Sequence, residues 1–422
     1  MSTDTAALLE QARSSARTLA KSSHAARQEA LQGILDALGE EKAAVLSANA
    51  EDAAAASRAG ISEALLDRLI LNESRFEGML RALREVISLP DPLSEIRKMG
   101  TRPNGLEVFR RRVPLGVLAI VYEARPNVTI EAASLALKSG NAIVLRGGRE
   151  ASRSNAALVR AAQNGLQRAG LPRECIQRVE DDSRERVKEL LQAVGYVDLV
   201  IPRGGPELMK MVDDWARVPV IRHGQGITHL FVDSSADAQM AEEIVFNSKV
   251  QRPGVCNALE TLILHEEWTA SDAWPRLALR LSRDGKAELR VDSRSAASLE
   301  AQGIPFRSAS ESDYSTEFLS LVLAVRTVPS LDQALAHIAE YGTRHTAGIV
   351  TQDERNAERF LQEVDASCVL WNASTRFNDG GELGLGSEMG ISTSKLHAYG
   401  PMGLRELTTE KFVVYGAGQV RG

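Results

Sequence analysis

The strand-and-helix stretch that decides the fold class is NAIVLRGGREASRSNAALVRAAQNGLQRAG, residues 141–170. It begins with a short apolar run, typical of a strand buried on both faces, and Gly147-Gly148 follow that run. From Ser152 the apolar residues recur at helical spacing, and Gly170 stands just past the expected helix end. A strand followed closely by a helix is the repeating unit of a parallel sheet covered by helices.

Similar units continue on both sides of this stretch. The first ninety residues are predicted to be helical, because leucines such as Leu31, Leu35 and Leu38 recur at helical spacing among charged residues. The ranges that have the pattern of strands are 106–123, 197–205, 218–224, 229–233, 260–265, 287–292, 319–328, 347–352 and 367–373. With amphipathic helices between them, this order predicts an α/β protein with parallel sheets and helices on both faces.

Composition and charge argue against several classes of protein. The chain has 422 residues and a formal net charge of -6, without the basic surplus that nucleic-acid binding needs. Its longest apolar runs fall short of the roughly 20 residues that span a bilayer. The first residues, MSTDTAALLEQARSS, lack the apolar core of a signal peptide, and the 3 widely spaced cysteines fit reduced thiols. We therefore expect a cytoplasmic protein with no nucleic-acid or membrane partner.

Two glycine-containing turns could hold the phosphates of a nucleotide. No GxGxxG follows a predicted strand, so the usual dinucleotide fingerprint is absent. In the first turn Arg146 ends a strand, two glycines follow, and Arg149 and Ser152 lead into a helix. In the second, Gly204 and Gly205 precede a helix N-terminus, where a backbone can approach a phosphate. Ordinary strand-to-helix turns would look the same, and both interpretations stay open.

One cysteine stands in a setting that suits a nucleophile. Cys256 lies in VQRPGVCNALE, residues 250–260, after a Pro-Gly pair and four residues past Arg252. Cysteine attacks as a thiolate, and a nearby cation lowers the pKa of the thiol. A buried structural cysteine fits the same stretch and is the more frequent case, so the stretch alone leaves both open. Cys368 has no cationic neighbour in sequence and is interpreted as structural.

Motifs along nearly the whole chain resemble the aldehyde dehydrogenase superfamily. They are VPLGVLAIVYEARPN, GNAIVLRGGREAS, RAGLP and AEYGTRHTAGIVTQD. YEARPN, KVQRPGVCNALETLILH and VPSLDQALAHIAEYGTRHTAGI are more closely similar to the gamma-glutamyl phosphate reductase family. One departure is Ala347, where the resemblance leads us to expect an acidic residue, so the role of that one position is in doubt.

The resemblance implies the domain organisation. It predicts an aldehyde-dehydrogenase-like α/β fold with two Rossmann-like parallel-sheet domains and a β flap. Residues 1–98 and 117–238 would form an NADP-binding domain, and residues 239–400 a catalytic domain. Residues 99–116 and 401–422 would form an oligomerisation flap, so the resemblance implies a homo-oligomer.

The same resemblance implies a reaction. Members of the family reduce L-glutamyl 5-phosphate with NADPH to L-glutamate 5-semialdehyde and phosphate, the second step of proline biosynthesis. Cys256 matches the nucleophile that forms the thioester, and Asn127 matches the amide of the oxyanion hole. Glu317 matches the glutamate that holds the nicotinamide ribose. Arg149 stands where NAD-using members carry a glutamate, and a cation there favours the 2′-phosphate of NADPH.

Further charged residues are expected at the substrate. RHGQGITH lacks the water-activating glutamate of aldehyde dehydrogenases and has His223 near its place, which favours reduction over hydrolysis. Arg125 and Arg252 flank the two reacting motifs and are predicted to bind the phosphate or carboxylate, with structural ion pairing as an equal alternative. Arg376 and Asp379, in a glycine-rich stretch, are predicted to contact the amino-acid end. The upstream glutamate 5-kinase is a candidate partner.

Rival functions remain open at this point. A reductase of the same fold could act on another acyl phosphate or acyl thioester, although YEARPN and YGTRHT argue against it. A non-catalytic protein on this fold is disfavoured by the joint presence of Cys256, Asn127 and Glu317. An additional kinase module is disfavoured because the chain has no phosphate loop and no room for it. His337 and His345 fit no zinc spacing and are interpreted as structural.

Overall fold

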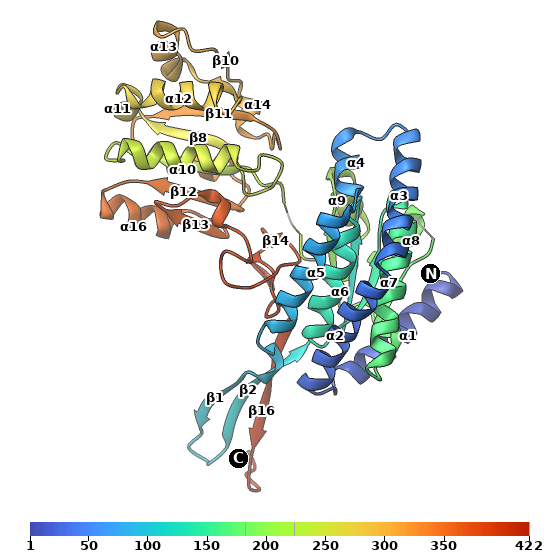
Figure 1. Cartoon of the computed structure of the whole chain (residues 1–422). Coiled ribbons are helices and arrows are strands. Elements are labelled where there is room, and N and C mark those ends of the chain that lie inside the picture. The colour runs from blue at the N-terminus through green and yellow to red at the C-terminus, as the bar shows by residue number, and fades with distance from the viewer. Residues whose placement is uncertain (182, 223, 422) are drawn as a thin grey trace.

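Two parallel sheets and one projecting antiparallel sheet organise the chain (Figure 1). This computed structural model describes residues 1–181, 183–222 and 224–421. The short pieces are the paired strands β14 (Ile391–Ser392) and β15 (Gly400–Pro401) and the 3-10 segments η1 (Pro92–Ser94), η2 (Arg149–Ala151), η3 (Arg173–Cys175) and η4 (Thr375–Phe377).

The first unit is a four-stranded sheet with helices on both faces. Its strand order is β5-β4-β3-β6, and every neighbouring pair is parallel. The strands are β3 (Val117–Tyr122), β4 (Ala142–Arg146), β5 (Ile176–Arg178) and β6 (Leu199–Arg203). The helices are α1 (Thr3–Leu19), α2 (His24–Glu40), α3 (Lys42–Arg58), α4 (Glu63–Leu69), α5 (Glu73–Ser88), α6 (Pro126–Lys138), α7 (Ser152–Arg168), α8 (Arg184–Leu191) and α9 (Pro206–Trp215).

Strand β3 is apolar at every position and does not alternate between apolar and polar residues. All of its residues are buried. Its even-numbered residues, from Leu118 to Tyr122, pack into a hydrophobic cluster with α2, α5, α6 and α7. Its odd-numbered residues, from Val117 to Val121, pack into a second cluster with α1, α8 and α9. Successive side chains of a strand point to opposite faces, and because helices cover both faces here, every position is apolar.

The second unit is a seven-stranded parallel sheet. Its strand order is β10-β9-β11-β8-β7-β12-β13. The strands are β7 (Thr228–Val232), β8 (Leu259–His265), β9 (Glu288–Val291), β10 (Arg307–Ser308), β11 (Val322–Val328), β12 (Thr346–Val350) and β13 (Cys368–Trp371). The helices are α10 (Ala238–Val250), α11 (Glu266–Thr269), α12 (Ala273–Arg283), α13 (Ser293–Ala301), α14 (Glu311–Tyr314), α15 (Leu331–Tyr341) and α16 (Glu354–Glu363).

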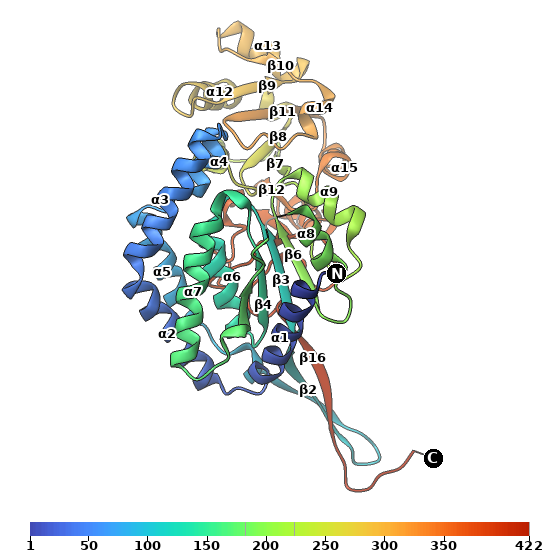
Figure 2. The same ribbon diagram turned by 90° about the vertical axis from the view of Figure 1, so that its right-hand side faces the viewer.

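The antiparallel sheet joins segments that are far apart in sequence. Its order is β1 (Ile96–Thr101), β2 (Glu107–Pro114) and β16 (Thr408–Tyr415). The C-terminal strand β16 pairs with β2 of its own chain along its whole length. Figure 2 shows this sheet projecting away from both parallel units.

Three details differ from the expectations drawn from sequence. Of the described residues in the expected strand 218–224, only Val220 forms a bridge, to Val200 of β6, and the neighbouring Pro219 has no N–H to donate to a ladder. Strand β7 pairs with β8 and β12 of the second sheet, whereas the expected boundary between the domains lies after it, at residue 238. Met389 and Ala398 pack into the core of the first unit, whereas the catalytic domain is expected to run to residue 400.

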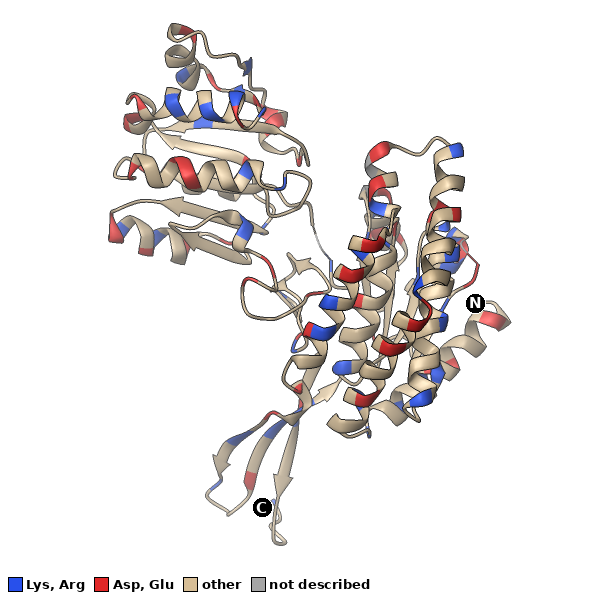
Figure 3. Ribbon diagram, viewed as in Figure 1, with Lys and Arg blue, Asp and Glu red and all other residues tan. Residues whose placement is uncertain are grey.

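The predicted α/β fold with parallel sheets is confirmed. Throughout the part of the chain that the structure describes, no helix combines the length and apolar character needed to cross a bilayer. Acidic and basic residues are interspersed along the helices of the first unit (Figure 3).

Candidate active site

Three turns meet at one edge of the four-stranded sheet. Residues 123–127 follow β3, residues 147–152 follow β4 and residues 204–205 follow β6, and these strands are parallel. The strand order reverses between β3 and β6, and open α/β sheets bind ligands at the carboxyl ends of strands at such a switch point. The topology therefore gathers at this edge Arg125, Asn127, Arg146, Arg149, Ser152, Gly204 and Gly205.

Cys256 and Glu317 lie at the amino edge of the seven-stranded sheet. Cys256 precedes β8, Glu317 precedes β11, and these two strands are neighbours. The backbone N–H of Gly226 donates to Oε1 of Glu317 at 2.9 Å. A Cβ on Gly226 would lie 2.1 Å from the carbonyl oxygen of Cys256, which accepts a hydrogen bond from Thr228 Oγ1 at 3.1 Å. Gly226 thus lies between the predicted nucleophile and the predicted ribose ligand.

Sequence reasoning did not identify Gly226. A glycine directly ahead of an apolar strand can mark a place where another backbone approaches closely, and that signal is present in GITHL. The approaching partner, however, is 30 positions further along the chain, in the turn that carries Cys256.

The Cys256 thiol is half-buried, and burial raises its pKa to about 11. The positive charge of Arg203 opposes this shift, whereas the carboxylates of Glu317 and Glu388 add to it. In this structure the thiol is therefore protonated near neutral pH, and the cations around it are the groups that favour the thiolate.

Arginines from both units lie near this thiol. Burial lowers the pKa of Arg125 to about 10, and repulsion from Arg203 adds to the shift. Burial also lowers the pKa of Arg376, and repulsion from Arg252 adds to it. Attraction to Cys256 opposes both shifts, which places these guanidinium groups in the electrostatic neighbourhood of the sulfur. Cations gathered in this way are suited to holding a phosphate or a carboxylate.

Arg203 and Glu388 are two further charged residues that sequence reasoning missed. Arg203 ends β6, and a Cβ on Gly390, whose φ is 132°, would lie 2.2 Å from its Nη1. Burial raises the pKa of Glu388 to about 7, repulsion from Asp379 adds to the shift, and Oε2 of Glu388 accepts the N–H of Gly380 at 2.9 Å. The position of Arg203, directly before a Gly-Gly turn, was the available signal.

The turn after β3 is held by a carboxylate from the turn after β4. Ala124 has a left-handed φ of 38°, and its N–H donates to Oε1 of Glu150 at 2.5 Å. This contact fixes the backbone that presents Arg125 and Asn127. Asn127 Nδ2 donates to Oε1 of Glu131, one helical turn later, at 2.7 Å. An amide nitrogen carries two N–H groups, so this bond uses one of them.

The two glycine turns pack against carboxylates of the chain itself. A Cβ on Gly148 would lie 2.1 Å from Oε1 of Glu150, and one on Gly204 would lie 2.6 Å from Oε2 of Glu123. The Gly205 N–H donates to that same Oε2 at 2.9 Å. A side chain at Gly148 or Gly204 would displace the carboxylate packed there, and phosphate binding by these turns stays a prediction.

The remaining residues expected at the cofactor lie along the turn after β4. Arg146 ends the strand and its Nη1 donates to the carbonyl oxygen of Gly147 at 3.2 Å. Arg149 is exposed at the start of η2, and Ser152 begins α7. Their proximity to one edge follows from the topology, and their role stays a prediction.

Two of the histidines weighed from the sequence, His337 and His345, are buried in the second unit. His223 lies outside the described residues. His337 is buried against Tyr314 and His229, with ring centroids 5.0 and 5.5 Å away, and burial lowers its pKa to about 3. His345 is also buried, and its Nδ1 lies 2.6 Å from a threonine hydroxyl. Within residues 1–181, 183–222 and 224–421, no group of three or more His, Cys, Asp or Glu residues could hold a metal ion.

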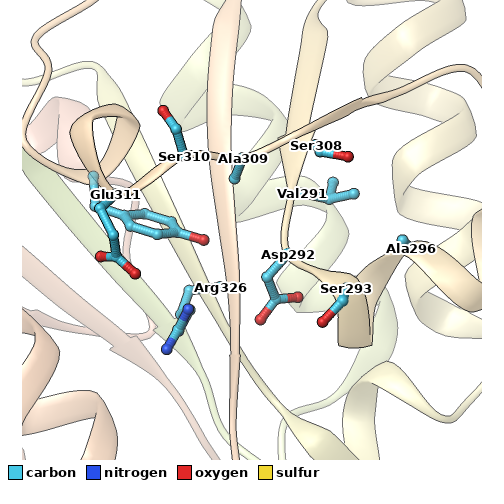
Figure 4. Close-up of a pocket in the computed structure, with 10 residues that line it drawn as sticks. Val291, Asp292, Ser293, Ala296, Ser308, Ala309, Ser310, Glu311 and Arg326 are labelled. Atoms are coloured by element: carbon cyan, nitrogen blue, oxygen red, sulfur yellow. The ribbon is translucent and has the colours of Figure 1, made fainter.

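A separate pocket lies at the opposite edge of the second sheet (Figure 4). Asp292 and Ser293 follow β9, and the pocket has a volume of about 300 Å³. Cys256 and Glu317 precede their strands, so they lie at the other end of the same parallel sheet. The pocket is lined by Val291, Asp292, Ser293, Ala296, Ser308, Ala309, Ser310, Glu311, Tyr314 and Arg326 and contains none of the residues expected to react.

Comparison with known proteins identifies the family. Residues 1–283 match the aldehyde dehydrogenase family. A gamma-glutamyl phosphate reductase of Sorangium cellulosum is 52% identical over 420 residues, covering 98% of this chain and 97% of that protein. The crystal structure of a gamma-glutamyl phosphate reductase from Thermotoga maritima is 41% identical and superposes with a TM-score of 0.94, covering 98% of this chain and 99% of that chain.

A more distant structure has the same fold. An engineered glycolyl-CoA reductase with bound NADP+ superposes with a TM-score of 0.68 at 18% identity, covering 97% of this chain and 96% of that chain.

Proposed function

The chain belongs to the aldehyde dehydrogenase family and, within it, to the gamma-glutamyl phosphate reductases, and from that premise we propose how its own residues carry the reaction. It reduces L-glutamyl 5-phosphate to L-glutamate 5-semialdehyde and phosphate, with NADPH as the reductant. The observation that supports this assignment of residues is the contact of Cys256 and Glu317 with one glycine, Gly226, beside several arginines.

Cys256 is the nucleophile. Its thiolate attacks the acyl carbon, the bond from that carbon to the phosphate oxygen breaks, and inorganic phosphate leaves with the electron pair. The acyl group remains on Sγ as a thioester. Asn127 and the backbone N–H of Cys256 donate to the oxyanion that forms during attack, and one such donor stabilises the transition state by about 3 kcal/mol.

Arginines near the thiol bind the anionic groups of the substrate. Arg125 and Arg252 hold the phosphate or the carboxylate, and Arg376 contacts the amino-acid end. The support for these roles is electrostatic. Arg125 interacts with the Cys256 sulfur and with Arg203, and Arg376 interacts with the same sulfur and with Arg252. Arg125 and Arg376 favour the thiolate before attack, and all three arginines favour the departing phosphate after it.

The groups proposed to hold the cofactor lie at the carboxyl edge of the first sheet, except Glu317, which lies at the amino edge of the second sheet. Glu317 is half-buried with one oxygen on the Gly226 N–H, and a carboxylate in that place can accept a ribose hydroxyl. Arg149, an exposed cation in the turn after β4, suits a 2′-phosphate, with Arg146, Ser152, Gly204 and Gly205 nearby in the topology. When bound, NADPH supplies the hydride that converts the thioester to the aldehyde.

The experiment that tests this function runs the reaction in reverse. Glutamate 5-semialdehyde, NADP+ and inorganic phosphate are supplied, and formation of NADPH is followed for wild type and Cys256→Ser. We expect phosphate-dependent activity in the wild type and none in the variant. Cys368→Ser, on the outer strand β13, is the matched control and should retain activity. Full activity in Cys256→Ser would end this proposal.

The projecting sheet is where a second copy of the chain docks. Strand β16 lies at an edge of its sheet, and Phe412, Val414 and Tyr415 on it are 60%, 52% and 61% exposed. An exposed apolar edge strand is a template for pairing with another strand. We expect the protein to be a homo-oligomer by light scattering, and Val414→Asp to lower its mass towards that of one chain. An unchanged mass would exclude this surface.

The proposed reaction also implies an upstream partner enzyme and a cellular location. An acyl phosphate hydrolyses readily, so the glutamate 5-kinase that makes it is the partner expected upstream, in the cytoplasm. A direct contact predicts that kinase-generated substrate is reduced faster than the same concentration of free substrate. Equal rates would leave the kinase as a supplier and not as a physical partner.

A further inference from the structure

A buried ion pair closes the base of the cysteine turn. Nζ of Lys249 lies 2.7 Å from Oε2 of Glu260, and neither side chain is exposed at all. Lys249 belongs to the last turn of α10, and Glu260 is the second residue of β8. The loop between α10 and β8, residues 251–258, carries Cys256. The pair therefore ties together the two ends of the turn that presents the thiol.

The same carboxylate also holds the segment that carries Glu317. Oε1 of Glu260 accepts the backbone N–H of Leu319 at 3.1 Å. Leu319 has a left-handed φ of 51°, a conformation that leucine rarely adopts without support from its surroundings. Leu319 lies two positions after Glu317, so Glu260 fixes the backbone next to the predicted ribose ligand.

These contacts form a closed circuit around the site. From Lys249 and Glu260 the chain leads to Cys256, whose carbonyl oxygen packs against Gly226. Gly226 donates to Glu317, and the segment of Glu317 returns to Glu260 through Leu319. Every link is a hydrogen bond, an ion pair, a close packing contact or a short stretch of backbone. A change at Glu260 can therefore reach both reacting residues without touching the substrate.

Stability alone does not account for such a pair. Removing two charges from water is expensive, and apolar residues of similar volume are often as stable or more stable in the same place. Burial raises the pKa of Glu260 to about 7 and lowers the pKa of Lys249, so the site resists ionisation of both partners. What an apolar pair would not replace is the acceptor for the Leu319 N–H.

We propose that Lys249 and Glu260 are positioning residues, which fix the Cys256 turn and the Glu317 segment relative to each other. This inference rests on the proposed function, because it assigns a role to residues that support the reacting ones. It makes Glu260 the more critical partner, since Glu260 makes contacts to both segments and Lys249 contacts only Glu260 among the described interactions.

The test compares two variants with the wild-type enzyme. The double variant Lys249→Met/Glu260→Leu removes both buried charges and the acceptor for Leu319. Lys249→Met/Glu260→Gln removes both charges and keeps a side-chain oxygen at the acceptor position. We expect both to unfold near the wild-type temperature, because neither leaves an isolated buried charge. A misplacement of about 1 Å lowers activity by roughly 100-fold, so turnover should slow by roughly 10- to 100-fold in the Leu variant and less in the Gln variant.

Two readouts separate positioning from general destabilisation. The rate of Cys256 alkylation by iodoacetamide should change in the Leu variant while the KM for inorganic phosphate stays close to wild type. Arg27→Met, which breaks the remote buried pair of Arg27 and Asp91, is the control: it should lower the unfolding temperature without changing alkylation. If the Leu variant has wild-type turnover and alkylation, the proposal is wrong.

The alkylation test of the positioning role can fail or succeed independently of the proposed reaction. Alkylation requires neither substrate nor cofactor, so it reports on the geometry of the turn even if the enzyme acts on another acyl group. If the double variants fail to fold, Lys249→Arg provides the same measurement with the charge retained. We expect Lys249→Arg, which keeps a cation opposite Glu260, to keep alkylation within about twofold of wild type, and a loss of about tenfold or more would contradict the proposal that the ion pair positions the turn.

Discussion

Gly226 donates its backbone N–H to Oε1 of Glu317 at 2.9 Å while its α-carbon lies against the carbonyl oxygen of Cys256. One residue without a side chain therefore sets the distance between a thiol on the β8 side of the sheet and a carboxylate on the β11 side. The contact depends on the absence of a Cβ, which makes it directly testable.

Gly226→Ala should disturb the thiol site more than the fold. The added Cβ would lie 2.1 Å from the carbonyl oxygen of Cys256, so the cysteine turn has to move. We expect a loss of about 1–3 kcal/mol in the free energy of unfolding, and turnover slower by about tenfold or more. Steady-state kinetics and urea unfolding measure the two effects.

Gly39→Ala is the matched control for this substitution. A Cβ on Gly39, in helix α2, would meet no atom within 4 Å, and alanine is the better helix former there. We expect unchanged kinetics and up to about 1 kcal/mol of added stability. Wild-type turnover in Gly226→Ala would show that the close approach is not needed for the reaction.

The reactivity of Cys256 should depend steeply on pH. Burial raises the pKa of its thiol to about 11, so only about one thiol in 10,000 is ionised at pH 7 without substrate. Alkylation by iodoacetamide should accelerate roughly tenfold per pH unit between pH 7 and 10. Arg203→Met should slow it further, because Arg203 lowers this pKa. Mass spectrometry of the Cys256 peptide, with Cys256→Ser as blank, measures the rate; a plateau below pH 8 would contradict the assignment.

The sequence was sufficient to predict the parallel sheets and to propose reacting residues, but it did not show which residues support them. A buried run such as that of β3 is visible because covered strands are apolar at every position. Cys256 and Glu317 were predicted as site residues because each lies in a motif similar to a known family. Gly226 was not, because its role arises only when two segments 91 positions apart meet in space.

Other residues could not be predicted from the sequence for the same reason, because their roles depend on contacts between distant segments. The sequence around Lys249 is that of a charged residue at the end of an amphipathic helix. Nothing in this segment shows that its side chain is fully buried against Glu260. Arg203 reads as the last residue of a strand. Its effect on the thiol depends on the packing of one unit against the other, which local patterns do not encode. The expected strand at residues 218–224 had apolar spacing, but the proline in it cannot donate to a ladder.

Glu388→Gln should stabilise the protein above neutral pH. Burial raises the pKa of Glu388 from its ordinary value of 4.5 to about 7, so between these values the folded chain binds more protons than the unfolded chain. Stability from this group is complete below pH 4.5 and is lost as pH rises through 7. Glutamine is neutral throughout and can still accept the Gly380 N–H.

The expected measurement is a thermal midpoint at two pH values. Glu388→Gln should unfold at a higher temperature than wild type at pH 8 and at nearly the same temperature at pH 5. Glu382→Gln, an exposed carboxylate in the same region, should leave both midpoints unchanged. A wild-type advantage at pH 8 would mean that the ionised carboxylate is held by a cation and is not penalised by burial.

Arg149→Ala should weaken the preference for NADPH. The exposed guanidinium can bind a 2′-phosphate that NADH lacks, and a hydrogen bond to a charged group contributes about 1.5–3 kcal/mol. We expect the KM for NADPH to rise by about tenfold or more, with the KM for NADH unchanged. Arg160→Ala, on the helix that follows and paired with Glu41, is the control. Wild-type use of NADH as efficiently as NADPH would remove the basis of this prediction.

Arg252→Ala should weaken the binding of phosphate and leave the reactivity of the Cys256 thiol unchanged. Arg252 is exposed in the cysteine turn and repels Arg376, so it lies where a phosphate can join the two cations. In the reverse reaction we expect the KM for inorganic phosphate to rise by about tenfold, since a charged hydrogen bond is lost, while alkylation of Cys256 keeps its wild-type rate. Arg307→Ala, at the far strand β10, should change neither. If phosphate KM is unchanged in Arg252→Ala, the anion site is formed without this residue, and Arg125 and Arg376 become the cations to test because both also interact with the sulfur.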